Sequence, residues 1–161
     1  MRAGAGLARR TALNAFARGA SCYARDARLQ QAVAWRLARH CRGLPLPEGP
    51  VVDLGAGSGN LSRSLAAQRP GIEPLLVDNC PELLAEAAAP ASRCRRWDLN
   101  AGLPPEARAA ALLLSSFALH WLQAPEQQLR HWCEQLRPGG WLALVVPLEG
   151  CLLYTSDAAD E

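Results

Sequence analysis

Short apolar runs alternate with segments of helical periodicity along most of the chain. Four of these runs read as strands and cover residues 51–54, 75–77, 109–114 and 141–146, and a further strand, third in chain order, is expected over residues 92–97. Between them, Leu61 and Leu65 are four residues apart, as on the buried face of a helix over residues 60–69. Strands that alternate with helices predict an α/β fold with a doubly wound, mostly parallel sheet and right-handed crossovers.

Two further helices follow the second and fourth predicted strands. A short alanine-rich helix is expected over residues 81–89. Another begins at Pro125, and its core face is expected to carry residues at positions i, i+3, i+4 and i+7: Leu129, Trp132, Cys133 and Leu136. The Arg137-Pro138-Gly139-Gly140 segment is expected to end this helix before the fifth strand.

An amphipathic helix is predicted ahead of the first strand, between residues 26 and 42. Its apolar residues recur every four positions: Leu29, Val33, Leu37 and Cys41. The first 25 residues contain several arginines and no acid, which fits a mitochondrial transit peptide or a helical N-terminal cap. We favour the cap, and divide the chain into a cap at residues 1–45 and a sheet domain at residues 46–150.

The segment from Pro50 to Leu65 carries the strongest signal for a ligand site. An apolar strand with one acid, Asp53, leads into glycines at every second position: Gly55, Gly57 and Gly59. Glycine permits positive φ and brings a backbone without Cβ against a ligand, and the following helix offers free N–H groups. A dinucleotide fingerprint requires a third glycine where Asn60 stands, so the pattern favours another ligand.

Two later acids also lie at strand ends. Asp78 ends the second strand about 20 residues past the glycines, where a carboxylate can accept hydrogen bonds from ribose hydroxyls. The alternative is a turn-forming Asp-Asn pair ahead of Pro81, which starts a helix well. Asp98 follows the third strand, and by itself it fits a strand-end turn equally well.

Together these features resemble class I S-adenosylmethionine-dependent methyltransferases, across residues 50–146. The resemblance implies a Rossmann-like fold in which the glycine turn packs on the methionine part of the cofactor, above Asp53. It also implies that Asp78 binds the ribose, that Asp98 accepts from the adenine amino group, and that the Leu99 N–H donates to the ring. The cofactor residues expected on this basis are Asp53, Gly55, Ala56, Gly57, Gly59, Asp78, Asn79, Asp98, Leu99 and Ser115.

Two segments resemble malonyl-[acyl-carrier protein] O-methyltransferases more narrowly. Residues 16–30 follow an F-x-x-x-A-x-x-Y-x-x-x-A-x-x-Q layout, and residues 115–121 resemble S-N-x-A-x-Q-W. This implies methylation of the free carboxylate of a malonyl thioester on acyl-carrier protein, at the start of biotin synthesis. Here Ser116 replaces the Asn and His120 replaces the Gln, so no role passes to His120. The candidate substrate or lid residues are Tyr23, Gln30 and Trp121, for which plain helix packing is the alternative.

No catalytic acid or base is assigned, because a carboxylate acceptor is already ionised at neutral pH. Catalysis then rests on in-line positioning and on removal of water from the carboxylate. Three alternatives stay open: another small-molecule carboxylate methyltransferase with an aconitate-type acceptor, a methyltransferase-like assembly factor acting on a partner protein, and an inactive fragment.

The amino-acid composition limits the binding partners, metal sites and cellular compartment to be expected. The 161 residues fit one domain, and a net charge of +2 gives no argument for nucleic acid or a membrane surface. Six cysteines form no C-x-x-C pair and no zinc spacing with the three histidines, so no metal site is expected. They indicate a reducing compartment, and we expect a cytoplasmic monomer.

The last residues differ from the rest of the chain. Residues 151–161, C-L-L-Y-T-S-D-A-A-D-E, resemble a translated sequencing adapter, so the native sequence is expected to stop at Gly150. The family's sheet normally has seven strands and only five are visible. We therefore expect a fold that is incomplete at the C-terminus, with the edge beyond residues 141–146 unpaired and prone to aggregation.

Overall fold

The computed structural model of the protein describes residues 28–147. The expectations for Tyr23, for residues 1–27 of the N-terminal cap and for the adapter-like tail fall on residues outside this range, whereas residues 28–45 of the cap lie within it. Within it, no helix is long and apolar enough to cross a membrane.

The described residues form a five-stranded parallel sheet with helices on both faces, which confirms the predicted α/β fold. The strands lie in the order β3-β2-β1-β4-β5. Their bounds are β1 Val51–Leu54, β2 Leu75–Asp78, β3 Cys94–Arg96, β4 Ala110–Ser116 and β5 Leu136–Val145. The α-helices are α3 Arg28–Cys41, α4 Asn60–Gln68, α5 Pro81–Glu86 and α6 Pro125–Glu134.

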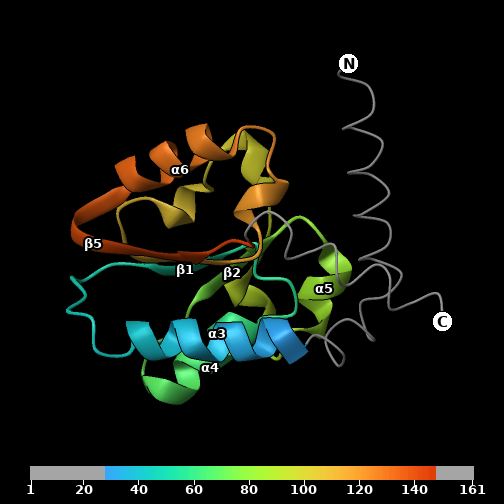
Figure 1. Ribbon diagram of the computed structural model, residues 1–161, viewed down its shortest axis with the longest axis vertical. Helices are drawn as coiled ribbons and strands as arrows, with labels where there is room; N and C mark the ends of the chain where they lie inside the picture. The colour runs from blue at the N-terminus through green and yellow to red at the C-terminus, as the bar shows by residue number, and fades with distance from the viewer. Residues whose placement is uncertain (1–27, 148–161) are drawn as a thin grey trace.

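Two apolar cores lie on opposite faces of the sheet (Figure 1). Helices α3 and α4 cover one face, where Leu61 and Leu65 pack with Leu112 and Leu114 of β4. Helix α6 covers the other face with Trp132, which is fully buried. The strand order reverses between β1 and β4, and in such sheets ligands bind beyond the carboxyl ends of the strands at this point.

The face by which α3 packs matches the predicted one in part, since Cys41 is buried and Leu37 packs against the core. Ala34, Ala38 and Cys41 are buried against α4, whereas Leu29 is 61% exposed. Small side chains at the contact allow two helices to approach closely, so Ala34 and Ala38 form the buried face together with Leu37 and Cys41. The C-terminal ends of α3 and α4 are joined, because the Arg69 guanidinium donates to the Cys41 and Leu44 carbonyls.

We expect Ala38→Leu to lower the free energy of unfolding by about 1–3 kcal/mol, because a larger side chain overpacks the α3–α4 contact. Ala32→Leu is the matched control, since Ala32 is exposed on the same helix, and it should change stability by less than about 0.5 kcal/mol. Urea unfolding of both variants measures the difference. Equal effects would mean that α3 does not pack on α4 as described.

Three element boundaries also differ from the predictions. Helix α5 ends at Glu86 instead of residue 89, since Ala87 is already extended, and β3 is confined to Cys94–Arg96. Helix α6 ends at Glu134, so Leu136 belongs to β5 and Cys133 is exposed. Only Leu129 and Trp132 of the predicted core face therefore pack into the core from α6.

The predicted turn at residues 137–140 is a bulged beginning of β5. Leu136 pairs with Ala110 and Trp141 with Leu112, so β5 carries more residues than β4 between these pairs. Gly139 has φ +78°, and a Cβ at Gly140 would lie 2.7 Å from the Ala110 carbonyl oxygen. Strand β5 lies at an edge of the described sheet, as expected, and its tendency to aggregate stays a prediction.

Candidate functional site

The glycine turn lies at the carboxyl end of β1 and is fixed to the neighbouring strand. The N–H groups of Gly55 and Ala56 both donate to the Val77 carbonyl of β2, at 2.8 and 3.0 Å. Gly55, Gly57 and Gly59 all have positive φ, and Gly59 is the N-cap of α4. The predicted sequence of strand, tight turn and helix start is confirmed.

Asp78 joins the tip of β2 to the glycine turn. Its Oδ2 accepts from the Gly57 N–H and its Oδ1 from the Cys80 N–H, both at 2.8 Å. Burial raises the pKa of the carboxyl group, while these backbone hydrogen bonds oppose the shift. An ionised carboxylate offers about four lone-pair positions, so Asp78 can accept further hydrogen bonds from ligand hydroxyls. The structure thus brings the predicted ribose acid beside the turn.

Asp53 lies beneath the turn and holds the beginning of α4. Its buried Oδ2 accepts from both the backbone N–H and the hydroxyl of Ser62, at 3.1 and 2.7 Å. Burial raises the pKa of Asp53 to about 7, against the Ser62 hydrogen bonds, and the nearby charge of Asp78 adds to the increase. Asp53 therefore acts on the site through the position of the helix N-terminus.

This raised pKa predicts that the free protein loses stability as the pH rises. The unfolded carboxyl titrates near 3.8 and the folded one near 7, so the stabilising contribution is present below pH 4 and disappears through pH 7. Asp53→Asn keeps an oxygen for Ser62 but cannot ionise. We expect the loss of stability between pH 5 and pH 8 to be smaller in this variant than in the wild type.

Urea unfolding at both pH values measures this difference. Titration of other groups contributes to both proteins and cancels in the comparison. Asp78 stays in both proteins and its raised pKa acts in the same direction, so the slope should fall without vanishing. An identical pH dependence in the two proteins would mean that Asp53 does not titrate in this range.

Asp98 takes the role of a turn acid in the contacts seen here. Its Oδ1 accepts from the backbone N–H and the side-chain amide of Asn100, at 2.9 and 2.7 Å, and caps the 3₁₀ helix η2 (Leu99–Ala101). Its carboxylate is exposed, and Leu99 is buried in the core. The backbone N–H of Trp97 donates to the backbone carbonyl of Asp78, so the loop that carries Asp98 lies beside the Asp78 end of the site. Adenine binding stays a prediction.

The remaining candidates are distributed around the same edge. The Ser115 hydroxyl donates to the Leu54 carbonyl at 3.1 Å and links β4 to β1 at the start of the turn. Trp121 is 42% exposed in the 3₁₀ helix η4 (Leu119–Trp121) after β4. Gln30 is near the N-terminus of α3. Because Arg69, after the C-terminus of α4, contacts the C-terminal end of α3, Gln30 lies toward the other end of α4, where the glycine turn is. Asn79 directly follows Asp78. Ligand contacts by these residues stay predictions.

Sequence reasoning missed several residues that shape the turn. Ser62 is one, because no local rule pairs it with Asp53 across nine residues. Ser58 is another, and its hydroxyl is buried without a hydrogen-bond partner. Ala118 packs directly on the turn, since a Cβ at Gly55 would lie 2.2 Å from the Ala118 Cβ. The resemblance of residues 115–121 to a family motif indicates that this segment belongs to the site, but it does not predict the contact of Ala118 with Gly55.

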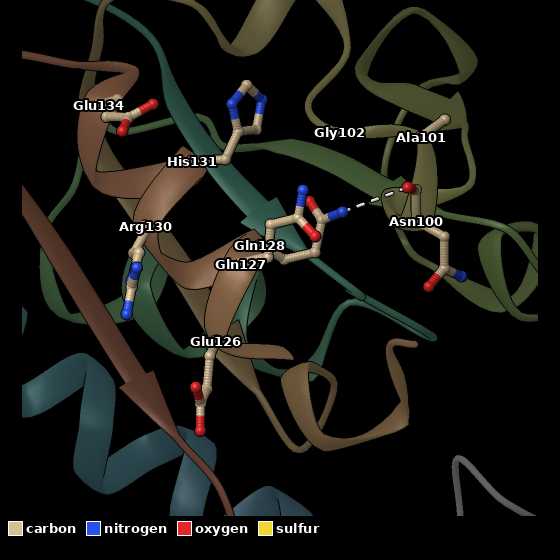
Figure 2. A pocket seen from close by; sticks show the side chains of 9 residues that line it. All are labelled: Asn100, Ala101, Gly102, Glu126, Gln127, Gln128, Arg130, His131 and Glu134. Atoms are coloured by element: carbon tan, nitrogen blue, oxygen red, sulfur yellow. Dashed lines mark hydrogen bonds between the residues drawn. The ribbon is translucent and has the colours of Figure 1, made fainter. Parts of the chain in front are cut away.

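A separate polar cavity of about 660 Å³ lies between α6 and the loop around Asn100 (Figure 2). It contains none of the glycine-turn residues. The Gln128 amide donates to the Asn100 carbonyl at 3.2 Å across it, while Arg130 and Glu134 point away from that loop. This cavity is therefore distinct from the predicted cofactor site.

Comparisons with known proteins agree with this geometry. The family profile described as "Methyltransferase domain" matches residues 21–160. Trans-aconitate 2-methyltransferase of Mycobacterium tuberculosis is 37% identical over 98 residues, which are 60% of this chain and 36% of the relative. The chain thus spans little more than a third of that relative's length.

Two solved structures are similar as well. An S-adenosylmethionine-dependent methyltransferase from Mesorhizobium loti has a TM-score of 0.53 and 30% identity, over 68% of this chain and 51% of that one. A structure described as a DhpI-SAM-HEP complex has a TM-score of 0.62 over 94% of this chain and 72% of that one. At 20% identity, this second likeness shows the fold alone.

Proposed function

The chain belongs to the family of methyltransferase domains, and we propose that it transfers the methyl group of S-adenosylmethionine to the oxygen of a small carboxylate. Membership confirms the expectation of a class I methyltransferase, an enzyme that uses S-adenosylmethionine. Which acceptor it uses is the new part of the proposal.

The observation that carries the cofactor assignment to this chain is the hydrogen bond from the Gly57 N–H to Asp78. It joins the glycine turn to the acid at the tip of β2, two parts of the motif that are 21 residues apart. A nucleoside at this edge meets a carboxylate for its hydroxyls and a backbone without side chains for the group next to it.

Support for a carboxylate acceptor comes from chemistry and from the named relative. A carboxylate needs no general base, because it is ionised at neutral pH. One of its oxygens attacks the methyl carbon, the S–CH₃ bonding pair moves to sulfur, and an ester and a neutral thioether result. The similarity to trans-aconitate 2-methyltransferase favours a free polycarboxylate. The malonyl thioester on acyl-carrier protein, the link to biotin synthesis and the cytoplasmic location stay predictions.

The test has two stages and uses the full chain. Calorimetric titration with S-adenosylhomocysteine should show saturable binding, and NADH as the control ligand should show none. Transfer from methyl-labelled S-adenosylmethionine is then measured with trans-aconitate and with malonyl-carrier protein. Label in a base-labile ester of trans-aconitate supports the proposal. Label only on the malonyl thioester would shift the acceptor to the carrier protein. Cofactor binding without transfer to any carboxylate would contradict the proposed acceptor class.

A further inference from the structure

One histidine that the sequence left without a role lies at the same edge as the glycine turn. Strand β4 ends at Ser116, and Phe117 follows with φ +55°, a strained conformation for a bulky residue. This turn sets Ala118 against Gly55. His120 comes two residues later in η4, whose Leu119 is anchored in the core. The strained backbone thus places Ala118, two residues before His120, against the turn.

The His120 side chain is in an unusual environment. Its Nδ1 is buried without a hydrogen-bond partner. Its Nε2 is not left buried and unsatisfied in this way. Its ring lies against Trp121, with the ring centroids 5.0 Å apart. A histidine with a purely structural role normally satisfies its buried nitrogen, so this one invites a different explanation.

We propose that His120 binds the acceptor, donating a hydrogen bond from Nε2 to the carboxylate that is methylated. This inference rests on the proposed function and names a residue that carries it. The acceptor must lie beyond the sulfur end of the cofactor, and η4 borders the glycine turn on which that end of the cofactor is expected to pack.

The electronic state of the ring suits this task. Burial lowers the pKa of His120, so the imidazole is neutral at neutral pH. A neutral ring with its proton on Nε2 also avoids a buried N–H without an acceptor at Nδ1. A neutral donor orients one carboxylate oxygen and leaves the negative charge available to the attacking oxygen. A cation in the same place would bind the acceptor more tightly and weaken the nucleophile.

Three variants of the full chain test the assignment. His120→Ala removes the donor, His120→Gln replaces it with a neutral amide donor, and His40→Ala changes an exposed histidine on α3 as the control. We expect His120→Ala to raise the acceptor KM about tenfold or more. The dissociation constant of S-adenosylhomocysteine and the melting temperature should stay within experimental error. His120→Gln should recover most of the loss, and His40→Ala should match the wild type.

An unchanged acceptor KM in His120→Ala would overturn the assignment. A proportional loss of S-adenosylhomocysteine affinity would also overturn it, because His120 would then support the cofactor or the fold.

A second measurement separates this inference from the proposed function. The imidazole proton signals of the three histidines are followed by NMR as trans-aconitate is added to the protein saturated with S-adenosylhomocysteine, with His120→Gln as the assignment control. A saturable shift of the His120 signal alone supports the contact even if no methyl transfer is found, in which case only the proposed function fails. No shift while trans-aconitate turns over would overturn the His120 contact and leave the proposed function intact.

Discussion

Gly55→Ala is expected to lower the free energy of unfolding by about 2–5 kcal/mol and to abolish measurable cofactor binding. Two costs combine. The residue has φ +70°, which costs a non-glycine residue about 1–2 kcal/mol. The added Cβ would also lie 2.2 Å from the Ala118 Cβ, so η4 must move away from the turn, and overpacking of this kind costs about 1–3 kcal/mol.

Gly71→Ala is the matched control for this prediction. Gly71 has φ +91° in the turn after α4, but a Cβ there would meet nothing within 4 Å. It carries the backbone cost without the collision and is remote from the ligand edge. We expect a loss of about 1–2 kcal/mol with unchanged affinity for S-adenosylhomocysteine. Urea unfolding and calorimetry of both variants decide the matter, and equal behaviour would show that Ala118 does not press on Gly55.

The second large effect is expected from Asp78→Ala, which should weaken S-adenosylhomocysteine binding by about tenfold to a hundredfold. The carboxylate is expected to accept from the ribose, and a hydrogen bond to a charged group contributes about 1.5–3 kcal/mol. The substitution also leaves the Gly57 and Cys80 N–H groups without their acceptor, which loosens the turn before any ligand arrives.

Two further variants serve as comparisons for Asp78→Ala. Asp78→Asn keeps one oxygen acceptor and should give an intermediate loss. Glu73→Ala removes an exposed carboxylate whose only ion pair among the described residues is with Arg93, and should leave binding unchanged. An unchanged dissociation constant in Asp78→Ala would remove this residue from the cofactor site.

The fold was readable from the sequence because its signals are local. Apolar runs mark four of the five strands of the described sheet, the exception being the arginine-rich β3, and the glycine spacing marks the turn between β1 and α4. Helix faces were less certain, since a helix with alternating small and large apolar residues supports more than one buried stripe. In α3 the four-residue spacing marked Leu37 and Cys41 correctly, but it included the exposed Leu29 and missed Ala34 and Ala38, which the close approach of α4 buries.

For the candidate site, the sequence predicts where the residues lie along the backbone, but not which side chains contact one another. The order of Asp53, the glycines and Asp78 follows from their places at strand ends, which the parallel sheet brings to one edge. The bond from Ser62 to Asp53 depends on the path of a folded helix, and the contact of Ala118 with Gly55 joins residues 63 positions apart in the sequence. Such contacts leave no short-range pattern.

The two acids beneath and beside the turn have a consequence for turnover. Asp53 and Asp78 have raised pKa values and repel each other, so a cation nearby would favour their ionised forms. The methyl donor is a sulfonium cation, whereas the spent cofactor is a neutral thioether. Uptake of the donor should therefore release protons, and loss of the methyl group should weaken the hold of the protein on what remains. The two acids would then favour both the binding of the methyl donor and the release of the neutral thioether.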